Sequence, residues 1–275
     1  MRRTRKLIGT PLSAARRVAL GVLPFAVVLV LYVYFSHQRH AENPLDRLMP
    51  NLGQLWDGLR EIGTADKRTG EIWLLADTRA SLGRLAQGMG AGLAIAVVLG
   101  LLAGIFSHAG AVISPLVTAL AKVPPLALLP IIFIFLGVEE SSKVVIIALG
   151  IAPTLAGDIA LAGRAVPRNT VVKAYTLGAS TPEVALKVVL PQILPRMLDS
   201  IRLTIGPAWI FLIAAEAISA ESGLGYRIYV VQRQLAMNVI LPYVVWIALI
   251  GLVMDYGLAA IGRWAFPWAE EGKGN

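Results

Sequence analysis

Six long apolar blocks constrain the fold of this chain more than any other feature. The first, residues 18–35, carries no charged side chain, and as a helix it would be about 27 Å long, close to the thickness of a bilayer core. The other five follow at about 85–106, 112–136, 144–163, 203–220 and 239–262. Composition agrees, because 56% of the residues are hydrophobic, only 15% are charged and the mean hydropathy is +0.69. We therefore predict an all-α polytopic membrane protein of about six transmembrane helices, forming a single domain over residues 1–275.

The distribution of basic residues predicts the orientation of these helices. Residues 1–17 contain basic side chains and no acid, and residues 164–202 carry six Lys and Arg against only Glu183 and Asp199. The positive-inside rule places both segments in the cytoplasm. Alternation of the helices then puts residues 36–84 in an outer loop and returns the C-terminus to the cytoplasm.

The N-terminal block has one alternative interpretation, a cleaved signal peptide, which also begins basic and continues apolar. Residues 36–40 offer no small-x-small cleavage site, and the apolar run is long. We therefore favour a signal anchor that precedes a core of five helices.

The net charge of +8 is compatible with lipid headgroups, an acidic partner or nucleic acid. The basic residues gather beside apolar blocks and form no single stripe with interleaved aromatics, so membrane lipid is the expected partner and nucleic acid is not. The chain contains no cysteine, which excludes disulfides and thiolate metal sites. Its three histidines, His37, His40 and His108, do not have the spacing of metal ligands, and we expect no metal.

The third apolar block is interrupted by Lys122, Pro124, Pro125 and Pro130. Each proline lacks a backbone donor, and broken helices persist in a membrane only where protein or a watery cavity satisfies the backbone. Glu216 lies deep in the fifth block, where a charge either contacts a substrate or pairs across helices. Lys122, Pro124, Pro125 and Glu216 are therefore candidates for a translocation path, with kinking and structural pairing as the alternatives.

Small residues recur at every fourth position of the second block, at Gly88, Gly92, Ala96, Gly100 and Gly104. This spacing forms a ridge without bulk along one helix face, which lets another backbone approach closely. The ridge predicts close packing against protein, either beside a pathway or subunit or within a static bundle.

The segment 172–191 resembles the EAA motif of ABC importer permeases, in which a Glu-Ala-Ala triplet precedes a glycine and an Ile-x-Leu-Pro sequence. Gly178, Leu190 and Pro191 keep the spacing of the motif, whereas the triplet retains only its last alanine, Ala174. The residues that the resemblance assigns to ATPase coupling are Val172, Lys173, Ala174, Gly178, Ala179, Ser180, Leu190 and Pro191. From the residues themselves, we predict a helix ending near Leu177, a turn at Gly178 and a second helix capped by Ser180 or Thr181, with Pro182 at its first position.

Over residues 80–265 the chain is similar to the nitrate, sulfonate and taurine branch of these permeases, as in Val123 to Pro130 and in Ala214 to Gly225. The resemblance implies a type I importer core in the bacterial inner membrane and a homodimer bound to two cytoplasmic ABC ATPases. ATP and Mg would be held by those ATPases, and a periplasmic or lipid-anchored binding protein would deliver the solute. Asn43 to Arg47 and Arg68 to Gly70 also resemble permeases of urea-carboxylase-type nitrogen metabolism, which adds urea- or guanidine-like solutes.

The sequence has no GxxxxGK[ST] phosphate loop, so we expect no ATP hydrolysis by this chain and no catalytic site.

Two other classes of protein serve as alternatives to an ABC permease. A secondary transporter driven by an ion gradient would explain broken helices and charges in spans, but it should show internal repeats. A membrane-embedded enzyme should show clustered His, Asp or Glu, whereas the acids here are dispersed.

Overall fold

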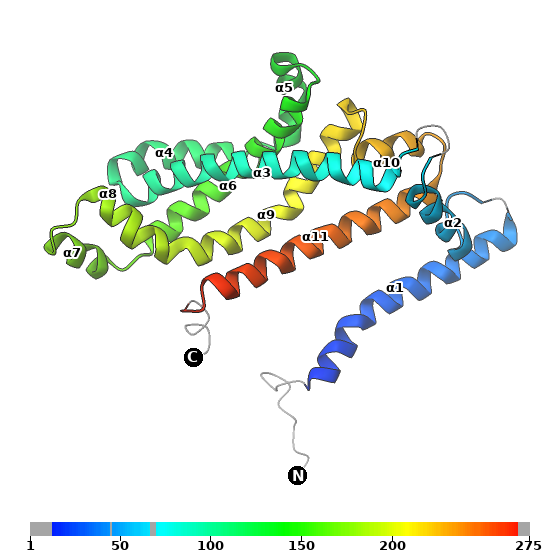
Figure 1. Ribbon diagram of the computed structural model, residues 1–275, viewed down its shortest axis with the longest axis horizontal. Coiled ribbons are helices and arrows are strands. Elements are labelled where there is room, and N and C mark those ends of the chain that lie inside the picture. The colour runs from blue at the N-terminus through cyan, green and yellow to red at the C-terminus, as the bar shows by residue number, and fades with distance from the viewer. Residues whose placement is uncertain (1–12, 45, 67–69, 269–275) are drawn as a thin grey trace, which may run out of the picture.

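A computed structural model describes residues 13–44, 46–66 and 70–268, and these residues are predominantly helical. The elements are α1 (Ala14–Glu42), α2 (Leu52–Gly63), α3 (Trp73–Ile105), α4 (Ser107–Leu120), η1 (Pro125–Leu128), α5 (Leu129–Leu136), α6 (Glu140–Arg164), α7 (Arg168–Thr176), α8 (Thr181–Glu183), η2 (Val184–Val189), α9 (Leu190–Ser219), α10 (Leu224–Gln232) and α11 (Met237–Ala265). Figure 1 shows α3, α6, α9 and α11 as an elongated bundle with α7 and α8 at one end and α2 and α10 toward the other. The fold is therefore all-α, as predicted.

Five stretches of the described chain are long and apolar enough to cross a membrane, namely α1, α3, α6, the continuous run α8 to α9, and α11. The third predicted span is broken at its prolines, as predicted, and with the bent pair of helices counted as one span the described chain has six. Residues 112–136 do not form one helix, because α4 ends at Leu120 and the pair formed by α4 and the segment Pro125–Leu136 is bent by 86°. Pro124 and Pro125 lack the N–H groups that would continue the ladder of α4, which accounts for the break.

Much of the predicted outer loop, residues 36–84, is helical in the structure. α1 continues to Glu42, and α3 begins at Trp73, so that about three turns assigned to the loop belong to a long helix. These turns contain polar residues that are buried between helices, which is why hydropathy alone left them outside the span. The predicted cytoplasmic loop, residues 164–202, likewise contains α7, α8 and η2 and the first turns of α9, which begins at Leu190.

The ridge of small residues on α3 packs against α6 of the same chain. A Cβ added at Gly88, Gly92 or Gly100 would lie 2.6 to 2.7 Å from a side-chain atom of Ile147, Ile151 or Ile159 respectively. Because these partners advance in step along both helices, α3 and α6 run parallel and in a fixed register. The ridge therefore builds the bundle of one protomer.

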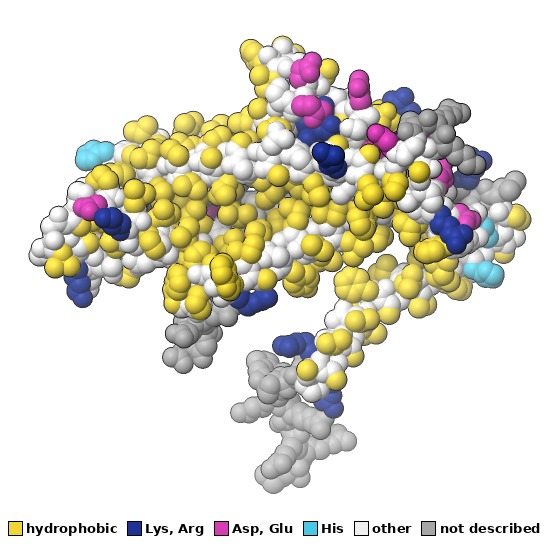
Figure 2. All heavy atoms as spheres, in the orientation of Figure 1, with side chains coloured by type: hydrophobic (Ala, Val, Ile, Leu, Met, Phe, Trp, Pro, Cys, Tyr) yellow, Lys and Arg dark blue, Asp and Glu magenta, His cyan; other side chains and the backbone are white. Residues whose placement is uncertain are grey.

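The first helix contrasts with the bundle. In α1 the whole of the most apolar window is exposed, and Figure 1 shows the helix standing apart from α11. Figure 2 shows a broad apolar surface along the long helices, with charged side chains gathered mainly toward their ends. That pattern is the one a lipid bilayer requires of the protein surface.

Candidate functional site

The predicted coupling segment forms a protruding elbow of two helices, α7 and α8, which we call the knob (residues 168–183). α7 ends at Thr176, and Gly178 adopts a φ of +86°, a left-handed conformation that favours glycine. The Ala179 N–H donates to the carbonyl of Ala174 at 3.1 Å, which closes the end of α7. The turn at Gly178 is therefore confirmed, and it redirects the chain within three residues.

The second helix of the knob begins with a reciprocal capping box. Ser180 is the N-cap, and its N–H and hydroxyl both donate to the carboxylate of Glu183, at 3.0 and 2.9 Å. Thr181 is the first helical residue, so Pro182 occupies the second position and not the predicted first one. Proline is tolerated in this first turn because its missing N–H would have had no partner there.

The knob exposes three large apolar side chains. Leu177 at its tip is 88% exposed, and Val172 and Tyr175 are exposed beside it. Lys173 is exposed as well, while Ala174 and Ala179 are half-buried beneath the turn. An exposed apolar tip on a stiff elbow is typical of a protein docking surface.

Leu190 and Pro191 lie where the knob joins α9, directly after the π-helical segment η2. In this segment the Leu190 N–H donates to the carbonyl of Ala185, five residues back. Pro191 has no N–H to donate, which helps to displace the ladder from its usual four-residue step. Single π turns of this kind are frequent at functional sites.

The elbow between α4 and η1 carries the other predicted path residues. Lys122 and Pro124 are exposed on the protomer, and Pro125 begins the short helix η1. α5 then leaves the bundle, as Figure 1 shows, and exposes Ile134 and Phe135 almost fully. The elbow thus lies on the surface of one protomer.

At the end of the bundle opposite the knob, a polar cluster that is largely buried, apart from the exposed Glu140, joins α3 to α6, α9, α10 and α11. We call it the outer lock (Asp77, Ser81, Arg84, Glu140, Lys143, Glu216, Arg227, Tyr243 and the backbone of residues 222–225). Within it, Asp77 accepts hydrogen bonds from the Gly223 N–H at 3.0 Å, from Arg227 at 2.9 Å and from the Tyr243 hydroxyl at 2.9 Å. One carboxylate on α3 therefore binds both α10, through its N-cap Gly223 and Arg227, and α11, through Tyr243.

Glu216 is the centre of the outer lock and has no exposed side-chain surface. It pairs with Arg84 at 2.7 Å and accepts further bonds from Ser81 and from the Gly225 N–H. Gly223, with a φ of +124°, passes so close that an added Cβ would lie 2.5 Å from the Glu216 carboxylate. Of the two roles left open for Glu216, the structure shows pairing across helices, and the side chain does not face an opening of the protomer.

Sequence reasoning found Glu216 but missed its partners. Arg84 also forms two bonds to Glu140, whose carboxylate in turn accepts from Lys143 at 2.8 Å. A usable signal was present, because Asp77, Ser81 and Arg84 recur at helical spacing directly before an apolar helix. Among the residues that the structure describes, no group of three His, Asp or Glu side chains is placed to hold a metal ion.

Comparison with known proteins places residues 96–267 on the model of a family described as "Binding-protein-dependent transport system inner membrane component". The taurine transport system permease protein TauC of Escherichia coli (strain K12) is 35% identical over 193 residues, which cover 70% of each chain. The bicarbonate transport system permease protein CmpB of Synechococcus elongatus is 30% identical over 203 residues, covering 74% of this chain and 71% of the relative.

Solved structures also share the fold. A chain from the methionine ABC transporter MetNI, in an inward-facing conformation, superposes with a TM-score of 0.63 at 19% sequence identity. The match covers 72% of this chain and 98% of the solved chain. The knob, the bent span and the outer lock are therefore built on a transporter architecture.

Proposed function

The chain belongs to the family of binding-protein-dependent transport system inner membrane components, the permease subunits of ABC importers. From that premise we propose which solute it carries, how transport is driven and which partners it needs. The observation that carries the proposal is the exposed knob on a chain 35% identical to a taurine permease. The solute is small and of the nitrate, sulfonate or taurine type. Relatives named for taurine, bicarbonate and aliphatic sulfonates support this class.

Urea- or guanidine-like nitrogen compounds form the second candidate class of solute. The observation that favours them is the resemblance of residues 43–47 in the outer segment to permeases linked to nitrogen metabolism. Uptake assays separate the two classes, because one is anionic or zwitterionic and the other neutral or cationic at neutral pH.

The driving force in this proposal comes from two cytoplasmic ABC ATPases, which bind ATP and Mg. The apolar tip of the knob, Leu177 with Val172 and Tyr175, docks in a groove of one ATPase. Closure of the ATPases moves the knob, and the continuous helix from α8 through α9 carries the movement into the membrane. To switch the permease between its two states, ATP must favour one of them by several kcal/mol.

The assembly in this proposal contains two copies of the chain, with both termini and the knob in the cytoplasm of a bacterium. The elbow at Lys122, Pro124 and Pro125 lies on the protomer surface and would line the path between the two copies. A periplasmic or lipid-anchored binding protein delivers solute on the face of the outer lock. A secondary transporter driven by an ion gradient would leave the knob without a role.

The experiment that tests this function is co-purification of the permease with its ATPase, followed by ATPase assays in proteoliposomes with and without the binding protein. Leu177→Asp removes the apolar tip without disturbing packing, because the side chain is 88% exposed. We expect this variant to lose the ATPase and solute uptake. Lys187→Gln is the matched control, because it changes an exposed charge just beyond the knob.

Retention of the ATPase by the native chain and Lys187→Gln, with loss in Leu177→Asp, supports coupling through the knob. Equal retention in all three would show that the knob is not the docking element. If the native chain drives uptake from an ion gradient alone, the ATP-driven mechanism is wrong.

A further inference from the structure

Helix α2 carries an apolar stripe that stays exposed among the residues that the structure describes. Leu52, Trp56 and Leu59 recur at helical spacing and are 56%, 55% and 39% exposed. The guanidinium of Arg60 lies 5.5 Å from the centre of the Trp56 ring, at the edge of the stripe. An apolar stripe with a tryptophan and a flanking arginine is the pattern of a helix that lies along a membrane surface.

One end of α2 is fixed beside the outer end of the apolar run of α1. The Tyr32 hydroxyl donates to the carbonyl of Pro50 at 2.6 Å, and the Ser36 hydroxyl donates to the carbonyl of Met49 at 3.0 Å. α2 begins two residues after Pro50, and Asn51 caps it in a capping box with Gln54. Because residues 18–35 of α1 must lie in hydrocarbon, the first turn of α2 lies at the boundary between lipid and water.

The middle of α2 is fixed at the start of α11. Gly58 approaches so closely that an added Cβ would lie 2.0 Å from the backbone oxygen of Asn238. Asn238 directly precedes the apolar run of α11, so this contact is also at a membrane boundary. The two anchor points together hold α2 along the plane of the interface.

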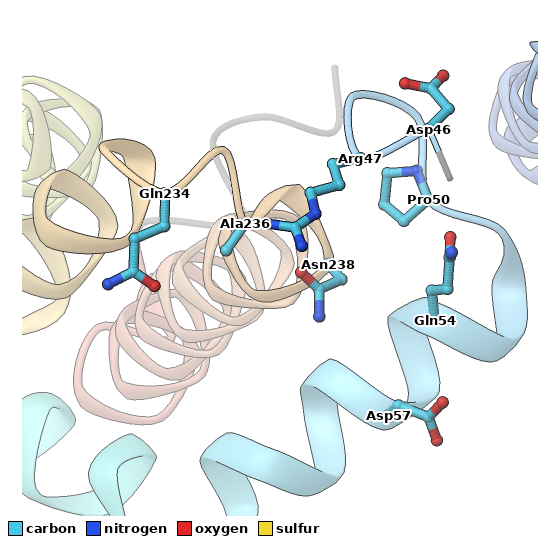
Figure 3. A pocket seen from close by; sticks show the side chains of 8 residues that line it. All are labelled: Asp46, Arg47, Pro50, Gln54, Asp57, Gln234, Ala236 and Asn238. Atoms are coloured by element: carbon cyan, nitrogen blue, oxygen red, sulfur yellow. The ribbon is translucent and has the colours of Figure 1, made fainter. Parts of the chain in front are cut away.

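The opposite side of α2 faces a polar pocket of about 330 Å³. Figure 3 shows its lining, with Gln54 and Asp57 from α2, three residues from the loop before it, and further residues around the start of α11. A polar pocket on one side and an apolar stripe on the other define which side of α2 meets water. In α1, to which the first turn of α2 is bonded, no residue of the most apolar window is buried.

From these contacts we propose that α2 is an interfacial helix whose stripe, Leu52, Trp56 and Leu59, inserts into the bilayer leaflet opposite the knob. The partner is glycerophospholipid, with acyl chains against the stripe and a phosphate near Arg60. The helix then ties α1, which stands outside the bundle, to the outer end of α11. This role does not depend on the solute, on ATP or on the proposed docking of the knob.

The absence of cysteine from the sequence allows a direct test. Leu59→Cys places a nitroxide spin label on the stripe, and Glu61→Cys places one on the polar side of the same helix, where the side chain is also exposed. Both variants are reconstituted as the full chain in vesicles of phosphatidylethanolamine and phosphatidylglycerol. Relaxation of each label is measured with oxygen, which concentrates in lipid, and with a nickel chelate, which stays in water.

We expect oxygen to act more strongly than the nickel chelate on the label at residue 59, and the order to reverse at residue 61. A second pair, Leu52→Cys and Asp57→Cys, repeats the comparison in case one variant folds poorly. Strong nickel relaxation on both sides would mean that α2 stands in water, and protection of the stripe from both reagents would mean that protein covers it. Either result overturns the proposal, while leaving the importer function untouched.

Discussion

The two ends of the bundle are built in opposite ways. At the outer lock, charged and polar side chains are buried, and Asp77, Arg84 and Glu216 each make several hydrogen bonds to different helices. At the knob, apolar side chains are exposed, and a left-handed glycine sets the angle between two short helices. The polar groups of the outer lock bond to one another, whereas the apolar side chains of the knob stay exposed in the part of the protomer that the structure describes.

This contrast indicates where movement enters the protein. Buried and mutually satisfied charges resist rearrangement, because separating any pair leaves an uncompensated charge in a medium of low dielectric constant. An exposed elbow that joins a long helix has little holding it in its own protomer. We therefore expect the outer lock to keep α3, α9 and α10 together as a unit while a force applied at the knob is transmitted along α9.

The largest predicted effect is on the outer lock. Glu216→Ala leaves Arg84 buried with one of its two carboxylate partners removed, and we expect the free energy of unfolding to fall by about 3–5 kcal/mol. Denaturant unfolding in mixed micelles measures this change. Glu221→Ala is the matched control, because this carboxylate is exposed nearby and its loss should cost at most about 0.5 kcal/mol. If both variants lowered the free energy of unfolding equally, the proposed difference between the two ends of the bundle would be wrong.

A smaller effect is expected at the register that connects the two ends. An added Cβ at Gly100 would lie 2.6 Å from Ile159 and 2.9 Å from the carbonyl oxygen of Ala156, so Gly100→Ala should force α3 from α6 and cost about 1–3 kcal/mol. Gly90→Ala, on the same helix, meets no atom within 4 Å and should be neutral or stabilising by up to about 1 kcal/mol. The same unfolding assay compares the pair. If Gly100→Ala proves harmless, the parallel register of α3 and α6 is not rigid.

The third effect is confined to the knob. No atom lies within 4 Å of a Cβ added at Gly178, so Gly178→Ala creates no clash and only strains the left-handed backbone, by about 1–2 kcal/mol. We expect ATPase activity stimulated by the binding protein to fall, while the free energy of unfolding drops by no more than this strain. A variant that destabilised the whole bundle instead would mean that the knob is part of the packed core.

The smallest effect is expected from Lys187→Gln. Lys187 pairs with Glu183 at 3.0 Å, but both side chains are well exposed and water screens their attraction. Neither unfolding nor coupling should change measurably, and raising the salt concentration of the native protein should have no effect through this pair. A clear loss of coupling would identify Lys187 as a contact to the ATPase.

Much of the fold follows from hydropathy and from turn chemistry. The blocks at 144–163 and 239–262 correspond to α6 and α11, and the turn at Gly178 lies where the glycine and the cap residues predict it. The break in the third block was also predicted, because Pro124 and Pro125 interrupt the apolar run, but hydropathy reports the length of a run and not its direction. Only the backbone geometry after Lys122 shows that the run bends by 86°.

The outer lock was harder to predict, because its members are far apart in the sequence. Asp77 and Gly223 are 146 residues apart in the sequence, and their contact depends on the register of α3 with α9 and α10. Arg84 was read as a residue of an outer loop, since charge ordinarily ends a membrane span. In the structure the charge of Arg84 is paired with carboxylates of other helices. The sequence of α3 alone does not identify these partners.

The π-helical segment η2 has a consequence for the evolution of coupling. A π turn arises from one residue more than an α-helix needs, and one residue corresponds to about 100° of rotation around a helix axis. Deletion of a single residue within Val184–Val189 would restore a regular α-helix and rotate the knob around the axis of α9. The number of residues in η2, more than their chemistry, would thus set the direction in which the knob points toward the proposed ATPase.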